Sequence, residues 1–78
     1  MAGIIGANVR RLRTAAGMSQ EKLGEAMGVH QSVVSYWENV YSWAPEGDDM
    51  LRLCELFGVE VGEFYRENQS QEIDNATT

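Results

Sequence analysis

Apolar side chains recur every three or four residues along most of the chain, and this spacing is typical of amphipathic helices. One such pattern covers residues 4–16, and two shorter ones lie on either side of Gly28 within residues 19–38. A fourth covers residues 48–57, and a short fifth begins near Glu60. The pattern therefore predicts an all-α fold of five helices, with the second and third joined by a tight turn at Gly28.

Residues on the inner faces of these helices are expected to form a single hydrophobic core. Hydrophobic residues make up 44% of the 78 residues, which is enough for burial to drive folding, and a chain of this length supports one core. The predicted core residues are Ile5, Val9, Leu12, Ala16, Leu23, Met27, Val29, Val34, Trp37, Met50, Leu53, Cys54 and Phe57. We predict one domain over residues 1–66, followed by a disordered polar tail over residues 67–78.

Several sequence features exclude whole classes of protein. No apolar run approaches the ~20 residues that a membrane-spanning helix needs, and no signal-peptide pattern opens the chain. The single cysteine, Cys54, excludes an internal disulfide and fits a reducing cytoplasm. His30 and Cys54 fall on different predicted helices, and no metal-ligand spacing, phosphate-binding loop or nucleophile motif occurs. We therefore expect a cytoplasmic protein that is not an enzyme and has no cofactor or metal.

The segment 19–38, SQEKLGEAMGVHQSVVSYWE, carries motif residues at fixed spacings. They are Ser19, Gln20, Leu23, Gly28, Val29, Val34, Ser35 and Glu38, which match the pattern SQxxLAxxxGVsxsxISxxE. Through these residues the chain resembles the Cro/phage-repressor (XRE-type) family of helix-turn-helix transcriptional regulators. The later segment LFGVEVGEFY resembles the family's ALGVSLDELF, so the resemblance spans about residues 4–65. It implies a compact, lambda-repressor-like DNA-binding domain.

Side chains that recognise bases in the major groove need paired donors and acceptors near the N-terminus of a helix. Gln31 fits, because its amide can pair with the N7 and the amino group of adenine, and Ser35 shares its helix face. The resemblance implies that Gln20 braces Gln31 and contacts a phosphate. The candidate DNA-binding residues are Gln20, His30, Gln31, Ser32, Ser35, Tyr36, Arg10 and Arg11. For the serines and arginines among them, a plain solvated surface is the alternative.

Three motif positions are expected to have structural roles. The resemblance implies that Arg13 and Glu38 form a partly buried ion pair, which fastens the first helix to the end of the third. His30 stands where the family usually has Ser, Thr or Asp, whose short oxygen caps the third helix. Because histidine is a poor cap, we expect either a weak cap or a side chain free for another contact.

Four aromatic residues, Tyr36, Trp37, Tyr41 and Trp43, occur in and after the third predicted helix. Trp37 takes an apolar motif position and is expected in the core, whereas Tyr36 is placed to contact a thymine methyl group or the DNA backbone. Resembling repressors have basic residues in the following loop, and their loss here predicts weaker phosphate binding. Tyr41 and Trp43 either cover the domain's own core or form an interface with a partner, and we favour the interface for Trp43.

The net charge of −6 conflicts with the basic surface expected of a nucleic-acid binder. Residues 1–35 hold four basic and two acidic side chains, a balance of +2, whereas residues 36–78 hold two basic and ten acidic ones, a balance of −8. The acidity therefore belongs to the half of the chain away from the predicted recognition helix. This separation reduces the conflict, although +2 is a thin positive surface.

These observations lead to the hypothesis of a transcriptional regulator that binds double-stranded DNA specifically, with the third helix in the major groove. A homodimer on a palindromic operator is expected, with half-sites about 34 Å apart. Its interface is placed around the fifth helix and the preceding turn, with Trp43 or Tyr41 at the edge. A phage repressor, a restriction-modification controller and an antitoxin fit equally. The alternative is a protein-interaction module that keeps the fold, binds DNA weakly or not at all, and presents the Tyr41/Trp43 loop to a toxin or co-regulator.

Overall fold

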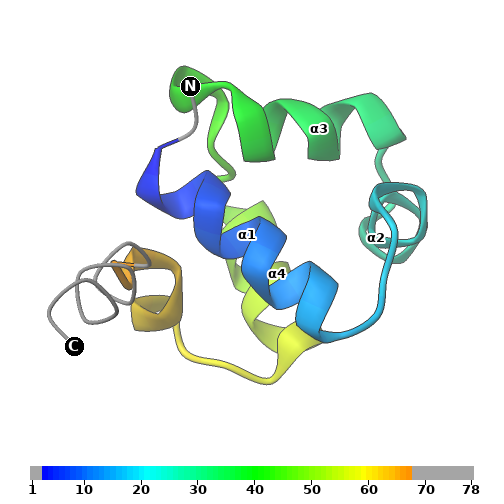
Figure 1. The fold of residues 1–78 in the computed structure, drawn as a ribbon. Helices are drawn as coiled ribbons and strands as arrows, with labels where there is room; N and C mark the ends of the chain where they lie inside the picture. Colours follow the sequence, from blue (N-terminus) through cyan, green and yellow to red (C-terminus); the bar gives the residue numbers. More distant parts are fainter. Residues whose placement is uncertain (1–2, 68–78) are drawn as a thin grey trace, which may run out of the picture.

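Residues 3–67 are described by the computed structural model, in which four α-helices and two short 3₁₀ helices surround one core (Figure 1). The elements are α1 (Ile4–Ala15), α2 (Gln20–Met27), α3 (Gln31–Asn39), η1 (Tyr41–Trp43), α4 (Asp48–Phe57) and η2 (Val61–Tyr65). Figure 1 shows α3 crossing above α1, with α4 behind α1 and η2 on the side of α1 away from α2. The two helices of the predicted helix-turn-helix motif therefore lie together, apart from η2.

Local capping chemistry sets the helix boundaries around the motif. Gly17 follows α1 in the left-handed conformation, with φ of 72°. The Ser19 hydroxyl caps α2, because its oxygen accepts a hydrogen bond from the backbone N–H of Lys22 over 3.0 Å. Gly28 ends α2 with φ of 75°, a conformation that favours glycine, so the tight turn predicted there is confirmed.

The prediction of a fifth α-helix is wrong. The chain after α4 instead forms η2, in which the Glu63 N–H donates to the Glu60 carbonyl over 3.0 Å. An α-helix begins with a costly first turn, which a five-residue segment containing Gly62 does not offset by adding further bonds. The described residues are therefore all-helical as predicted, but with four α-helices.

A single cluster of buried side chains joins the helices. Its members are Val9, Leu23, Met27, Val34, Trp37, Met50, Leu53 and Phe64. The predicted core residues lie in this cluster or pack against it, except Ala16, which is exposed because α1 ends one residue earlier. Phe64 comes from η2 and is fully buried, so this short helix closes the core.

The polar residue Asn8 is also fully buried, on α1. Its amide donates to the carbonyl of Ile4 over 3.0 Å and to that of Arg66 over 2.7 Å, and its oxygen accepts from Arg11 Nε over 2.9 Å. Because every polar atom of this side chain has a partner, its burial is tolerated. Asn8 therefore ties the end of η2 to α1.

Part of the sequence lies outside the described residues. Residues 68–78 include most of the predicted tail, so both the tail and the domain boundaries stay predictions. Within residues 3–67, every helix falls short of the length and apolar character that crossing a bilayer requires.

Candidate nucleic-acid interface

Close contact between α2 and the start of α3 positions the helix-turn-helix. A Cβ atom on Gly24 would stand 2.7 Å from the Val29 carbonyl oxygen, so only glycine permits this approach. The chain then reverses at Gly28 and enters α3 at Gln31. The N-terminus of α3 consequently sits beside the first turn of α2, which places Gln20 next to it.

A shallow hollow of about 440 Å³ lies on the surface where these two helix starts meet. It is lined by Gln20, His30, Gln31, Ser32, Ser35 and Tyr36, and we call it the polar hollow. The fold thus brings six of the eight predicted DNA-binding residues to one surface. Arg10 and Arg11 do not line it. The Gln31 side chain makes no hydrogen bond to another described residue, so its amide is available to a ligand.

His30 caps α3, so its Nδ1 is not free for another contact. Its Nδ1 accepts a hydrogen bond from the backbone N–H of Ser32 over 3.0 Å and lies 2.9 Å from the Ser32 hydroxyl. The imidazole nitrogen thus takes the place of the short oxygen usual at this position.

Glu38, at the end of α3, is buried and receives hydrogen bonds from two other elements. Arg13 on α1 donates through Nε to Oε2 over 2.6 Å and through Nη2 to Oε1 over 3.1 Å. Gln20 on α2 donates its amide to Oε1 over 3.1 Å, and Arg10 Nε lies 3.6 Å from the same oxygen. The two partners that the resemblance paired are thus joined, and Glu38 links all three helices.

Gln20 braces Glu38 instead of Gln31, so this part of its expected role is wrong, and its phosphate contact stays a prediction. Its amide nitrogen is bonded to Glu38, and no hydrogen bond joins it to Gln31 within the described residues. Gln20 also lines the polar hollow, and the bond to Glu38 uses only one of its two amide hydrogens, which leaves the other hydrogen and the carbonyl oxygen for a further partner. A carboxylate in the protein interior thus fixes the orientation of a side chain on the candidate surface.

The two remaining candidates, Arg10 and Arg11, differ in their contacts and exposure. Arg11 donates through Nη2 to the carboxylate of Glu63 over 2.9 Å and to its carbonyl over 3.1 Å. This bond, together with Arg66, holds the pKa of the Glu63 carboxyl below its ordinary value. The Arg10 side chain is 60% exposed. Arg10 is therefore better placed than Arg11 to reach a phosphate.

Two features of this surface were missed by sequence reasoning. Asn39 is exposed on α3, and its amide donates to the Ser35 carbonyl over 3.0 Å, so the four-residue spacing from Ser35 was the available signal. Trp43 packs against Tyr36, with ring centroids 5.1 Å apart and planes inclined by 51°. Because Tyr36 also lines the polar hollow, an aromatic pair borders that surface.

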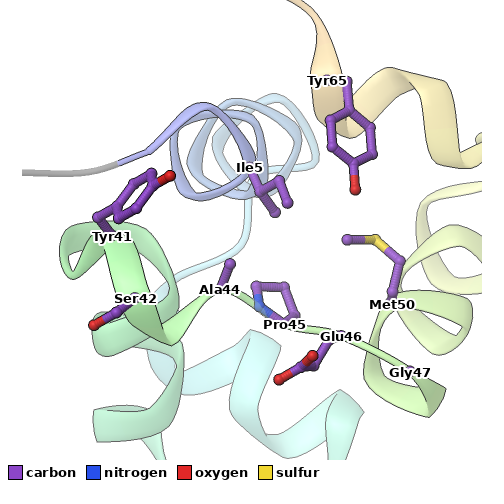
Figure 2. Close-up of a pocket in the computed structure, with 9 residues that line it drawn as sticks. All are labelled: Ile5, Tyr41, Ser42, Ala44, Pro45, Glu46, Gly47, Met50 and Tyr65. Carbon is purple, nitrogen blue, oxygen red and sulfur yellow. The ribbon is translucent and has the colours of Figure 1, made fainter.

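A second hollow, of about 380 Å³, shares no lining residue with the polar hollow (Figure 2). Figure 2 shows Ile5, Met50 and Tyr65 directed toward one another from α1, α4 and η2, above the chain at Pro45. Its lining residues are Ile5, Tyr41, Ser42, Ala44, Pro45, Glu46, Gly47, Met50 and Tyr65. We call it the Pro45 hollow.

Comparison with known proteins supports the identification of the motif. A helix-turn-helix family model matches residues 9–64, which include the polar hollow, the Arg13–Glu38 pair and most of the core. No curated protein matches the chain. Among residues 3–67, no group of three or more His, Cys, Asp or Glu side chains is arranged to hold a metal ion.

Proposed function

The chain belongs to the Cro/C1-type (XRE) family of helix-turn-helix DNA-binding proteins, and from this premise we propose that it recognises a specific operator as a homodimeric transcriptional regulator. In this proposal α3 enters the major groove with its N-terminal residues against the base edges. The single observation that carries the proposal is the polar hollow, which gathers amide, hydroxyl and imidazole groups at the start of α3. A phage repressor, a restriction-modification controller and an antitoxin are equally consistent regulators.

Within the polar hollow, Gln31 is assigned the principal base contact. Its amide offers a donor and an acceptor side by side, which matches the N6 and N7 edge of adenine. Gln20 is held by Glu38 and is assigned a phosphate contact, together with the exposed Arg10. His30 can donate from Nε2 while its Nδ1 caps the helix. Ser32 and Ser35 complete the surface that faces the groove.

Dimerisation is proposed because one such domain offers a short recognition surface, and two copies related by a twofold axis match a palindrome. Three exposed apolar side chains at the C-terminal end of the described residues support this part of the proposal: Leu56, Val61 and Tyr65. They lie around η2 and the preceding turn. Light scattering at high protein concentration tests it, and a monomer both with and without DNA would contradict it.

The decisive experiment for recognition uses Gln31→Ala. An operator is first selected from random duplexes with the wild-type protein, and binding is then measured to this operator and to a scrambled duplex of equal length. The variant should lose about 1–3 kcal/mol on the operator, because a bidentate base contact is removed. It should bind the scrambled duplex as the wild type does, since no charge is lost.

Arg10→Ala is the matched control for that experiment. It removes a charge near the same surface, so binding to both duplexes should weaken together and the salt dependence should flatten by about one unit of slope. Helix content measured by circular dichroism should be unchanged for Gln31→Ala, because alanine is the better helix former at this exposed position. Wild-type selectivity in Gln31→Ala would overturn the assignment of α3 as the recognition helix.

A second candidate function is a protein-interaction module that has kept the fold. The observation that favours it is the exposed Tyr41 at the Pro45 hollow, on a chain of net charge −6. Binding to random duplex DNA across a salt series separates the two functions. A regulator forms a complex that weakens steeply with salt, whereas an interaction module forms none.

A further inference from the structure

The aromatic pair of Tyr36 and Trp43 occupies an unusual position for two large rings. Tyr36 comes from α3 and Trp43 from η1, and the rings pack against each other with 46% and 55% of the residues' surface exposed. Tyr36 also lines the polar hollow, so the pair continues that surface beyond the N-terminal half of α3. Two half-exposed rings beside a proposed binding surface indicate that a ligand covers them.

The distance along α3 indicates which part of a DNA ligand the pair would meet. Tyr36 follows Gln31 by five residues, which is about 7.5 Å of helix at 1.5 Å per residue. The major groove is about 12 Å wide, so a helix with Gln31 against the bases brings the residues beyond Tyr36 to the flanking strand. Trp43, which packs on Tyr36, would then lie near sugar and phosphate.

Four of the six cations of the chain are engaged elsewhere in the fold, and the other two, Arg10 and Lys22, belong to α1 and α2. Arg11 and Arg66 are bonded to Glu63, Arg13 is buried against Glu38, and Arg52 donates to the Met27 carbonyl over 2.9 Å. Neutral donors are present instead, on the aromatic pair itself. Among the described residues, neither the Tyr36 hydroxyl nor the Trp43 indole N–H has a hydrogen-bond partner. Both groups can donate to a phosphate oxygen, and both rings can pack on deoxyribose.

We propose that the Tyr36–Trp43 pair is a contact for the DNA sugar-phosphate backbone, which replaces charged phosphate contacts with neutral donors and apolar surface. This inference rests on the proposed function and assigns Trp43 to DNA, whereas the sequence favoured a protein interface. Because the contact carries no charge, it adds affinity for any duplex sequence without adding to the salt dependence.

The test compares Trp43→Phe and Trp43→Ala with the wild type on the operator and on the scrambled duplex. Trp43→Phe keeps a ring but loses the N–H, and it should weaken binding to both duplexes about fivefold, as expected for one hydrogen bond. Trp43→Ala should weaken both by about tenfold or more, with the slope of affinity against salt unchanged. The unchanged slope distinguishes these variants from Arg10→Ala.

Tyr41→Ala is the matched control, because Tyr41 belongs to the same short helix, is exposed, and lines the Pro45 hollow instead of packing on Tyr36. It should leave affinity for both duplexes unchanged. Tryptophan fluorescence adds a readout that needs no alanine variant, since Trp37 is buried in the core. Adding DNA should change the emission of the wild type and leave that of Trp43→Phe, which retains only Trp37, nearly constant.

Three results would overturn the inference. They are wild-type affinity of Trp43→Ala and Trp43→Phe for both duplexes, a loss confined to the operator, and a loss of self-association with DNA affinity retained. If Trp43→Ala does not fold, the affinity of Trp43→Phe and the fluorescence change still test the proposed contact. Failure of this inference can be told apart from failure of the proposed function. If only the inference fails, the wild type still selects an operator, and Gln31→Ala still binds that operator more weakly.

Discussion

Two junctions fasten α1 to the rest of the molecule, and each is built from a glutamate that meets two arginines. At the junction with α3, Glu38 binds Arg13 and lies near Arg10, and at the junction with η2, Glu63 meets Arg11 and Arg66. The Glu38 side chain is fully buried, whereas that of Glu63 is 36% exposed. The same ionic groups therefore work in two very different surroundings.

The difference in burial changes what each glutamate does. A buried charge is costly to leave without partners, so Glu38 requires Arg13 and fixes the relative position of three helices. Through Gln20 it also reaches the polar hollow. The Glu63 cluster is screened by solvent and salt and contacts no residue that lines that hollow. The comparison indicates that the Glu38 ion pair is connected to the candidate interface through Gln20, whereas the Glu63 cluster is not.

The largest expected effect comes from Glu38→Gln. The variant leaves Arg13 buried without a counter-charge, so the free energy of unfolding should fall by about 3–5 kcal/mol, measured by urea denaturation. That is a large part of the roughly 4–12 kcal/mol expected for a domain of this size. Glu63→Gln is the control and should lose much less, by an amount that shrinks further at high salt. Equal losses in the two variants would show that burial does not distinguish the junctions.

A smaller effect is expected from alanine at the glycines of the two junctions. A Cβ on Gly6, in α1, would overlap the backbone carbonyl oxygen of Trp37, whereas a Cβ on Gly62, in η2, would meet nothing within 4 Å. Gly6→Ala should therefore lower the free energy of unfolding by about 1–2 kcal/mol, even after the gain in helix propensity. Gly62→Ala should stay within about 0.5 kcal/mol of the wild type. If Gly6→Ala is instead stabilising, α1 and α3 are less closely packed than described.

The smallest effect is the acid sensitivity of the η2 junction. The hydrogen bond from Arg11 lowers the pKa of Glu63 in the folded state, so the ionised carboxylate stabilises the fold above its unfolded pKa, about 4.3. This stabilisation is lost as the pH falls below that value and through the lowered pKa. Urea midpoints measured between pH 5 and 3 should therefore fall more for the wild type than for Glu63→Gln. If the urea midpoints of the two proteins fall equally with pH, Glu63 does not contribute to the acid sensitivity.

Much of the fold could be predicted because its determinants are local in sequence. Ser19 and Gly28 set the ends of α2 through bonds and dihedral angles within a few residues, and apolar periodicity placed most of the core. The type of η2 could not be predicted, because a five-residue segment with one buried phenylalanine is compatible with either helix type. The pairing of Arg13 with Glu38 was implied only by resemblance to a family.

The sequence predicted which residues form the candidate surface, but not the hydrogen bonds that they make. The motif named the residues that line the polar hollow, whereas the attachment of Gln20 to Glu38 depends on the angle between α2 and α3. Arg11 is bonded to a residue 52 positions away, which no local pattern indicates. The packing of Trp43 on Tyr36 is likewise set by the path of the chain after α3. Contacts between distant segments were thus the part that sequence patterns did not contain.

The Gln31 side chain makes no hydrogen bond to the rest of the described residues, and this affects how the domain can change in evolution. An exposed side chain that the fold does not use can be exchanged with little effect on stability. Gln20 lacks that freedom, because it is bonded to the buried Glu38. Under the proposed function, substitution at position 31 changes the operator while the buried Glu38 keeps the scaffold unchanged, so we expect a library varied at that position alone to yield folded proteins with new specificities.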